Sequence, residues 1–221
     1  MKLPGMIWRD GEFVAEQVAV DGLAELVAAP DQLSWIDLRH PAVEQLAALG
    51  KELGFDAHTI EDALSPRERP KTVRYSGYTF SLVAAANLGV KKASGSRLHL
   101  SYLGVYSIGG CLITVQQGAP FDMQPVVERW RDDRDLVAFG VDGLLQAVLD
   151  VVVDQYTAVL QKLDEELDGV ADQLFVANPD SKGLQQQAFS IRRELSELRR
   201  IITPMREAVA TLIHNGQGAK N

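Results

Sequence analysis

The sequence predicts an α/β sandwich with a mixed, largely antiparallel sheet, followed by a long, projecting antiparallel helical hairpin. Up to about Gly118, short helical patterns mix with strands rich in β-branched and aromatic residues, and strand patterns stop beyond Pro120. Two long helical patterns then repeat apolar residues at steps of three and four, which places one apolar seam along each helix. We therefore divide the chain into a sheet domain, 1–118, and a helical region, 119–221.

Strands and short helices are expected to share the first part of the chain. MIWRDGEFVAEQV predicts a hairpin turning at Asp10-Gly11, and DGLAELVAA predicts a short helix with Asp21 as its N-cap. SWIDL predicts a buried strand, and HPAVEQLAALGKELG a helix with Pro41 in its first turn and Gly54 after its end. The next helix contains Glu61-Asp62. Four strands then follow a basic loop: TVRY, YTFSLVAAANL, RLHLSYLGVYSI and CLITVQQ.

The second part is expected to be helical throughout. PFDMQPVVERWRDD predicts one helix, and a much longer helix should run from Val141 to Phe175. The short connection NPDSKG makes the two long helices antiparallel neighbours, Pro204 should bend or break the second, and the tail HNGQGAKN should be a loop. The predicted seam residues are Leu145, Leu149, Val152, Tyr156, Val159, Leu163, Leu167, Val170 and Leu174, then Leu184, Ala188, Ile191, Leu195, Leu198, Ile202, Met205, Val209 and Leu212.

Composition narrows the class of protein. The 221 residues carry a net charge of -8, which disfavours nucleic acid and anionic lipid as partners and favours cations. Cys111, the single cysteine, lies in the apolar run CLITV, so no intramolecular disulfide can form and a reducing compartment is expected. No export signal is visible, and the best membrane-span candidate, LLQAVLDVVVDQYTAVL, is interrupted by polar residues, so no membrane span is expected.

Two pairs of carboxylates are candidate cation ligands. Glu61 and Asp62 point about 100° apart on a helix, so each should face a different surface and need oxygen ligands from another element or subunit, as Mg²⁺ or Ca²⁺ requires. The alternative is a solvated pair held by nearby bases. Asp150 and Asp154 share one helix face and repel each other unless a cation or base intervenes; the alternative is an exposed stripe.

Other polar groups favour simpler interpretations. The basic loop is expected to offset Glu61, Asp62 and Glu68, with a nucleic-acid patch as the alternative that the net charge disfavours. Acidic residues between Asp164 and Asp172 form a ridge on the first long helix, and this ridge is expected to be solvated. The histidines show no metal-ligand spacing and no catalytic motif is present, so we do not expect an enzyme. These groups are Arg67, Arg69, Lys71, Arg74, Tyr75 and Tyr78 in the loop, Asp164, Glu165, Glu166, Asp168 and Asp172 in the ridge, and His40, His58, His99 and His214.

The order of these segments resembles the cytoplasmic domain of the CorA magnesium/cobalt transporter family, also called two-TM-GxN proteins. The likeness covers nearly the whole chain, and it rests on six strings that occur in the family's order with compatible spacing. These are WIDL at 35–38, IEDAL at 60–64, ERPK at 68–71, LITV at 112–115, LLQAVLDVVVDQY at 144–156 and IRRELSELRRIITPMREAVATL at 191–212.

This resemblance implies a pentameric cation channel with an α/β/α cytoplasmic sandwich, a helical hairpin, a stalk helix and two membrane helices joined by a Gly-Met-Asn loop. The last three have no counterpart in this sequence. We therefore expect a fragment from the cytoplasmic face of the cell membrane that cannot transport by itself. We also expect the fragment to be a monomer or a dimer.

The resemblance also implies roles for the carboxylates. Asp62 matches a residue that faces a stalk carboxylate of the neighbouring subunit, with Mg²⁺ between them holding the channel closed. Glu61 and Asp150 match the surroundings of a second cation, and Asp154 is a further candidate. The chain is thus expected to be the metal-sensing and gating domain of a Mg²⁺ or Co²⁺ transporter. The alternatives are a zinc-transporting ZntB-type domain and a freestanding helical interaction module.

Overall fold

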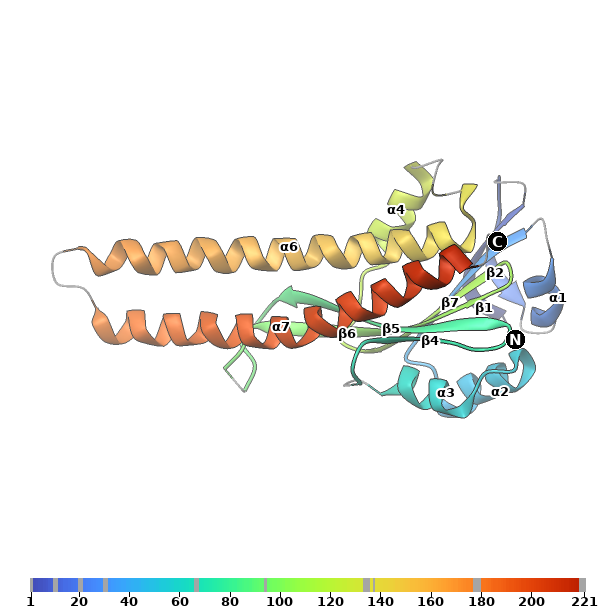
Figure 1. Cartoon of the computed structure of the whole chain (residues 1–221), viewed down its shortest axis with the longest axis horizontal. Coiled ribbons are helices and arrows are strands. Elements are labelled where there is room, and N and C mark those ends of the chain that lie inside the picture. Colours follow the sequence, from blue (N-terminus) through green and yellow to red (C-terminus); the bar gives the residue numbers. More distant parts are fainter. Residues whose placement is uncertain are drawn as a thin grey trace.

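The structure, a computed structural model, describes residues 2–9, 12–19, 22–29, 32–65, 68–93, 95–132, 136, 138–176 and 180–218. Figure 1 shows a sheet between two helical layers, from which two long antiparallel helices project together. The expected sandwich with a helical hairpin is therefore confirmed.

One mixed sheet forms the centre of the sandwich. Its strands lie in the order β2-β1-β3-β7-β6-β5-β4. β3 and β7 are parallel, and every other neighbouring pair is antiparallel, as expected for the second half. The strands are β1 (Lys2–Arg9), β2 (Glu12–Ala19), β3 (Gln32–Arg39), β4 (Lys71–Arg74), β5 (Tyr78–Leu88), β6 (Leu98–Ile108) and β7 (Cys111–Gly118).

The composition of each strand fits its place in the sheet, either between other strands or at an edge. β5 and β6 are buried along most of their length, because helices cover both of their faces and most of their side chains are apolar. β4 is short, carries Lys71 and Arg74 and lies at an edge, where charged side chains oppose pairing with another chain.

Three short helices cover one face of the sheet: α1 (Leu23–Ala28), α2 (Val43–Leu53) and α3 (Ala57–Leu64). The N-cap of α1 is Gly22, at φ 96°, and Asp21, the expected cap, lies outside the described residues. Pro41 precedes the N-cap Ala42 of α2 rather than lying in its first turn, while Gly54 ends α2 in the left-handed conformation, as expected. The first two strands form the expected hairpin, although its turn lies outside the described residues.

The opposite face is covered by α4 (Gln124–Asp132), the first half of α6 (Val141–Leu174) and the last part of α7 (Ser181–Gly218). α6 is the one helix among the described residues that is long and apolar enough to cross a membrane. Half of its apolar stretch is buried inside the protein, largely against β5. Packing on the sheet therefore accounts for its composition.

The seam of the hairpin is largely as predicted. Most of the predicted residues are buried or half-buried between the helices or against the sheet, but Leu167 and Leu174 are 44% and 53% exposed. Beyond the sheet, two helices alone bury only a narrow stripe, and a helix with 3.6 residues per turn drifts away from a strict step of three and four. Those two side chains therefore turn toward solvent.

α7 is longer than predicted. Pro204 lies inside it without breaking it, and Figure 1 shows the helix changing direction in its C-terminal part, toward the sheet. The expected loop at 214–218 is wrong because the helix continues to Gly218; residues 219–221 lie outside the description. Extending a helix that is already formed costs little, so Asn215-Gly216, which usually marks a helix end, does not stop it here.

The seam makes a testable prediction. Leu198 is 1% exposed, so Leu198→Asp buries a charge without a partner and should lower the free energy of unfolding by at least about 3 kcal/mol. Gln186→Asp, at an exposed position of the same helix, should cost less than about 1 kcal/mol. Urea denaturation followed by circular dichroism measures both, and equal midpoints would contradict the seam.

Candidate functional site

Asp62 lies in a polar site between α3 and β4. The helix begins at Asp56, whose carboxylate accepts a hydrogen bond from the backbone of His58, and Tyr106 donates to the carbonyl of Thr59 at 2.8 Å. These contacts hold α3 on the sheet. Asp62 is thereby placed beside the edge strand with its side chain 19% exposed.

The partner of Asp62 within the chain is a lysine. The ammonium nitrogen of Lys71 lies 2.8 Å from Oδ2 of Asp62 and 3.6 Å from Oε1 of Glu68. Burial alone would lower the pKa of Lys71, but its hydrogen bond and attraction to Asp62 outweigh burial and raise that pKa. One base of the loop, Lys71, therefore offsets Asp62 and Glu68, as the sequence indicated, whereas the base expected beside Glu61 is not found among the described residues.

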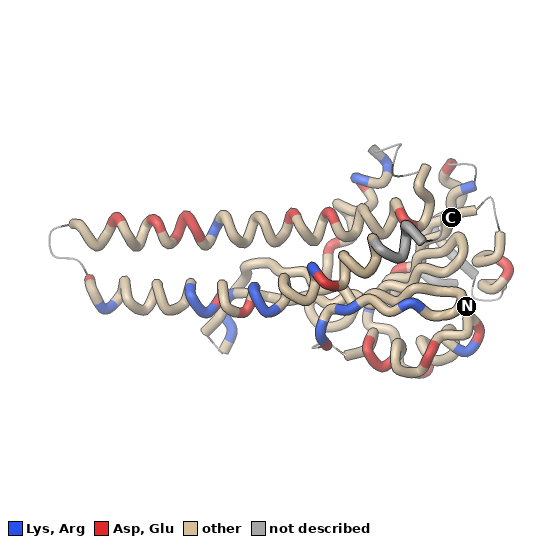
Figure 2. Tube along the Cα trace, viewed as in Figure 1, with Lys and Arg blue, Asp and Glu red and all other residues tan. Residues whose placement is uncertain are grey.

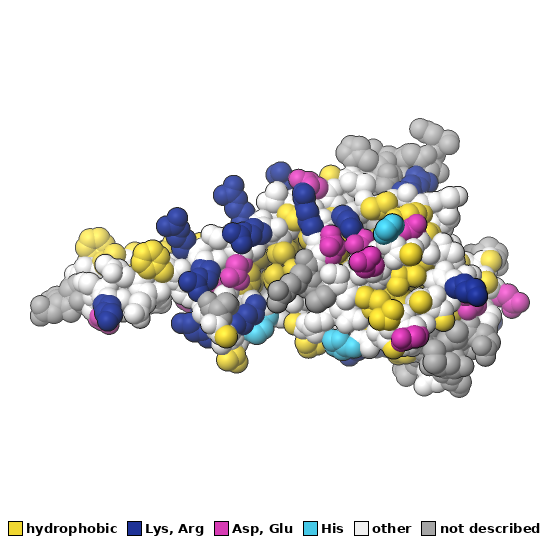
Figure 3. Space-filling view, turned by 90° about the horizontal axis from the view of Figure 1, so that it is seen from below, with side chains coloured by type: hydrophobic (Ala, Val, Ile, Leu, Met, Phe, Trp, Pro, Cys, Tyr) yellow, Lys and Arg dark blue, Asp and Glu magenta, His cyan; other side chains and the backbone are white. Residues whose placement is uncertain are grey.

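Glu61, the neighbour of Asp62, is exposed and has no ion-pair partner within the described part of the chain. Its separation from Asp62 follows from the helical step of about 100°. Figure 3 shows acidic side chains gathered on the face of the domain seen from below, with basic side chains on the projecting hairpin. Glu61 is thus available to ligands from outside the chain.

Asp150 and Asp154 come together around an arginine. Arg129, from α4, places Nη2 at 2.6 Å from Oδ2 of Asp154 and Nη1 at 4.0 Å from Oδ2 of Asp150. Both carboxylates are exposed by roughly half, at 46% and 63%. A base therefore intervenes between these like charges, as their spacing required, and it holds α4 to α6.

The chain does not bring Glu61 and Asp150 together. α3 packs on one face of the sheet and α6 on the other, so the sheet lies between the two carboxylates. Within the described residues, no three histidine, cysteine, aspartate or glutamate side chains are placed to hold a metal ion.

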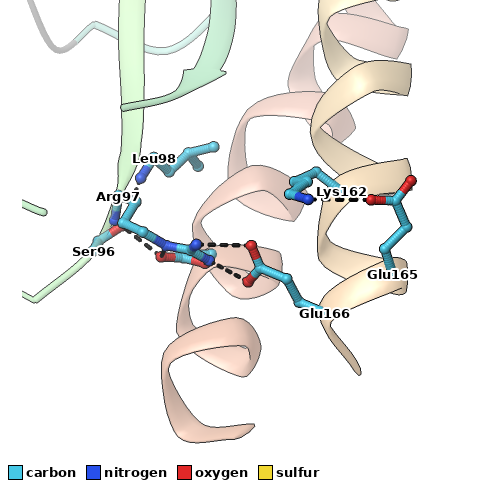
Figure 4. Close-up of polar contacts among 7 residues, drawn as sticks. Ser96, Arg97, Leu98, Lys162, Glu165 and Glu166 are labelled. Carbon is cyan, nitrogen blue, oxygen red and sulfur yellow. Dashed lines mark hydrogen bonds and ion pairs between the residues drawn. The ribbon is translucent and has the colours of Figure 1, made fainter. Parts of the chain in front are cut away.

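A third group of charges was not predicted. Arg97, just before β6, lies between Glu194 of α7 and Glu166 of α6 (Figure 4). Its Nη1 and Nη2 donate to the two oxygens of Glu166 at 2.9 and 2.7 Å. Its Nε and backbone N donate to Oε1 of Glu194 at 3.0 Å, and Nη2 donates to Oε2 at 2.7 Å. We call these residues the Arg97 cluster.

The Arg97 cluster joins the sheet to both helices of the hairpin. Glu194 is fully buried and Glu166 is 18% exposed, so the expectation of a solvated Glu166 is wrong. Burial alone would raise the pKa of Glu194, but hydrogen bonds and attraction from Arg97 outweigh burial and lower it. The pKa of Arg97 is raised, first by its bonds to Glu166 and then by those to Glu194.

One signal in the sequence could have revealed this cluster. Glu194 lies three residues after Ile191 and four before Leu198, which is the spacing of the buried seam. A charged residue at such a position needs a partner of opposite charge. The identity of that partner, Arg97, nearly one hundred residues away, follows only from the fold.

The remaining candidates have structural roles. Tyr75 and Tyr78 stack with ring centroids 4.8 Å apart, and Tyr78 is buried, so this pair does not form an open surface for bases. Arg69 pairs with Glu207 of α7 at 2.6 Å, both exposed, while Arg67 lies outside the described residues. Cys111 is fully buried, and burial raises its pKa to about 11, as expected for a core thiol.

This fold is shared with known structures. The soluble domain of CorA from Methanocaldococcus jannaschii superposes with a TM-score of 0.67 at 16% identity, covering 94% of this chain and 78% of that one. The ZntB cytoplasmic domain from Vibrio parahaemolyticus has a TM-score of 0.66 at 13% identity, covering 96% and 79%. These likenesses show that the chain has the fold of the CorA soluble domain.

The family follows from sequence. The sequence model of the CorA-like Mg²⁺ transporter protein family matches residues 30–221, so the chain belongs to that family. It is 27% identical over 165 residues to the cobalt/magnesium transport protein CorA of Thermotoga maritima, a match covering 74% of this chain and 46% of that protein. The chain spans about half the length of the curated relatives it matches.

The Arg97 cluster predicts a large loss of stability on truncation. Arg97→Ala leaves Glu194 buried without its partner and should lower the free energy of unfolding by about 3 kcal/mol or more. Arg69→Ala, which removes an exposed pair with Glu207, should cost less than about 1 kcal/mol. Thermal unfolding compares the two variants, and similar melting temperatures would contradict a tethering role for Arg97.

The same cluster predicts a dependence on pH. The folded-state pKa of Glu194 is lowered, so its contribution to stability is present above its ordinary pKa of 4.5 and is lost as pH falls through the folded value. As the pH is lowered from 5, the free energy of unfolding should therefore fall less in the double variant Arg97→Met/Glu194→Gln than in the parent. Unfolding curves at several pH values measure this, and parallel losses would exclude Glu194 as a contributor.

Proposed function

We propose that this chain is the metal-sensing cytoplasmic domain of a CorA-like divalent cation transporter. The match to the family from residue 30 to residue 221 supports this proposal, because it spans β3 to β7, which are five of the seven strands, together with α4 and the hairpin. The chain then acts as a binding domain rather than an enzyme. Helices outside this sequence would carry the membrane-spanning part and complete a homo-oligomer.

Mg²⁺ is the regulatory ion that we propose, with Co²⁺ or Zn²⁺ as alternatives. Hard cations take several oxygen ligands, and Mg²⁺ keeps part of its water shell. Asp62 can supply carboxylate oxygen from a partly exposed position at the edge of the sheet, and Glu61 is exposed beside it. The likeness to a ZntB domain is a likeness of fold and does not favour zinc.

Asp62 would form one half of a site whose other half comes from a neighbouring copy. Within one chain its charge is balanced by Lys71, so an incoming cation competes with that ammonium group. Asp150 and Asp154 remain proposed ligands for a second cation, which would compete with Arg129 in the same way. Cation binding at either place is therefore expected to be weak until another copy adds ligands.

Calorimetric titration of Mg²⁺ into this chain tests the proposal. Binding should be weak, and Asp62→Ala should abolish the part of the heat that belongs to this site. Lys71→Met should strengthen binding by roughly two- to fivefold, since it removes a competing, partly exposed ion pair worth up to about 1 kcal/mol. Asp168→Ala, which removes an exposed carboxylate in the second half of α6 outside both proposed sites, serves as the matched control.

Tight binding that ignores Asp62→Ala would contradict the assignment of Asp62 and would direct attention to Asp150 and Asp154. In the longer protein, the same substitution should leave the pore harder to close at high Mg²⁺. A cation can favour the closed state only through its higher affinity for that state. Unchanged inhibition of the current by Mg²⁺ would mean that Asp62 is not a sensor.

A further inference from the structure

A cavity of about 660 Å³ lies on the side of the sheet that α4 covers, away from the carboxylate pairs discussed above. It opens at the carboxyl end of β3, beside β1, and the connection that follows β7 contributes Asp122 and Met123 to its wall. The lining combines apolar side chains with a few polar ones, as in sites for small organic molecules. The residues that matter for its chemistry are Met6, Trp35, Asp37, Arg39, Met123 and Val127.

Beside this cavity, the connections that follow β3 and β7 pass to opposite faces of the sheet. β3 leads into α2, which packs on one face of the sheet, and its parallel neighbour β7 leads into α4, which packs on the other. The connections therefore diverge and leave a crevice between the strand ends. In open α/β sheets, ligands bind in the crevice at such a point.

The acidic groups of the cavity are already engaged. Oδ1 of Asp37 accepts hydrogen bonds from Thr114 at 2.8 Å and from Gln116 at 2.9 Å, and Oδ2 accepts from Nε of Arg39 at 2.9 Å. Asp122 accepts from the backbone N of Gln124 at 3.0 Å, where α4 begins. Asp37 thus uses both of its oxygens to fix one wall of the cavity, and Asp122 uses one of its two oxygens to hold the start of α4.

The charged group of the cavity with the most unused hydrogen-bonding capacity is a donor, Arg39. Arg39 donates through Nε to Asp37, and its two Nη groups make no hydrogen bond within the described part of the chain. Its side chain is 64% exposed at the mouth of the cavity. Pro41, just before the N-cap of α2, and Gln45, in its first turn, also line the cavity, and α2 begins without a side-chain cap. A ligand must therefore bring acceptors.

We propose that this cavity binds a small organic anion with an apolar or aromatic body. Arg39 takes the anionic group through its Nη donors, since a guanidinium forms charge-assisted bonds with carboxylate, sulfonate or phosphate oxygens. The body of the ligand rests against Met6, Met123 and Val127. Bound there, it bridges the starts of α2 and α4. This site does not depend on the proposed sensing of cations.

Fluorescence titration with anilinonaphthalene sulfonate tests the site, because this probe joins an aromatic body to an anion. Phenylnaphthylamine, which has a similar aromatic body without the sulfonate, is the matched ligand. The parent chain should bind the sulfonate saturably, and Arg39→Gln should weaken that binding about tenfold while leaving phenylnaphthylamine unchanged. Arg74→Gln, an exposed arginine on the edge strand at the far side of the sheet, should change neither.

A second variant tests where the apolar body of the ligand binds. Val127→Phe puts a larger side chain into the cavity and should weaken both probes, with thermal unfolding used to confirm that the variant is folded. Because Arg39 is exposed, Arg39→Gln is expected to fold, and it therefore tests the proposal even if Val127→Phe does not fold. Absence of saturable binding to the parent, or equal sulfonate affinity in the parent and Arg39→Gln, would overturn it.

Discussion

The burial of α6 against β5 is the constraint on which the rest of the structure depends. A helix of 34 residues is about 50 Å long, and its first half supplies much of the core on one face of the sheet. Because the helix is continuous, the direction of this buried half also fixes the direction of the half that projects beyond the sheet. α7 then follows the projecting half back to the sheet, as Figure 1 shows.

Apolar packing alone would not fix how the hairpin sits on the sheet. Burial of leucine and valine is non-directional, so a regular seam tolerates a shift along the helix axis. Hydrogen bonds have directions, and Arg97 makes them to one residue of each long helix. Figure 2 shows acidic residues along α6 and basic residues along α7, charges that favour the observed antiparallel neighbours. The buried charge cluster thereby selects one register.

The sheet also separates the polar sites. Asp62 and Lys71 lie at its β4 edge, Asp150 and Asp154 lie with Arg129 on the face covered by α4 and α6, and the cavity lies at the carboxyl end of β3, beside β1. Each acidic group considered as a cation ligand, apart from the exposed Glu61, already has a basic partner in the chain. Cation binding within a single copy is therefore a competition between ions, which lowers its apparent affinity.

The sequence by itself determined the elements, because periodicity and turn residues act locally: the strands, the two long helices and the buried Cys111 follow from them. Six strings in order also indicated the family to which the chain belongs. Only the tertiary structure decided which charges meet. The pairing of Arg97 with Glu194, of Lys71 with Asp62 and of Arg129 with Asp154 joins residues on different elements, and local pattern carries no information on distance between elements. The cavity likewise exists because two parallel strands send their helices to opposite faces, which is a property of topology.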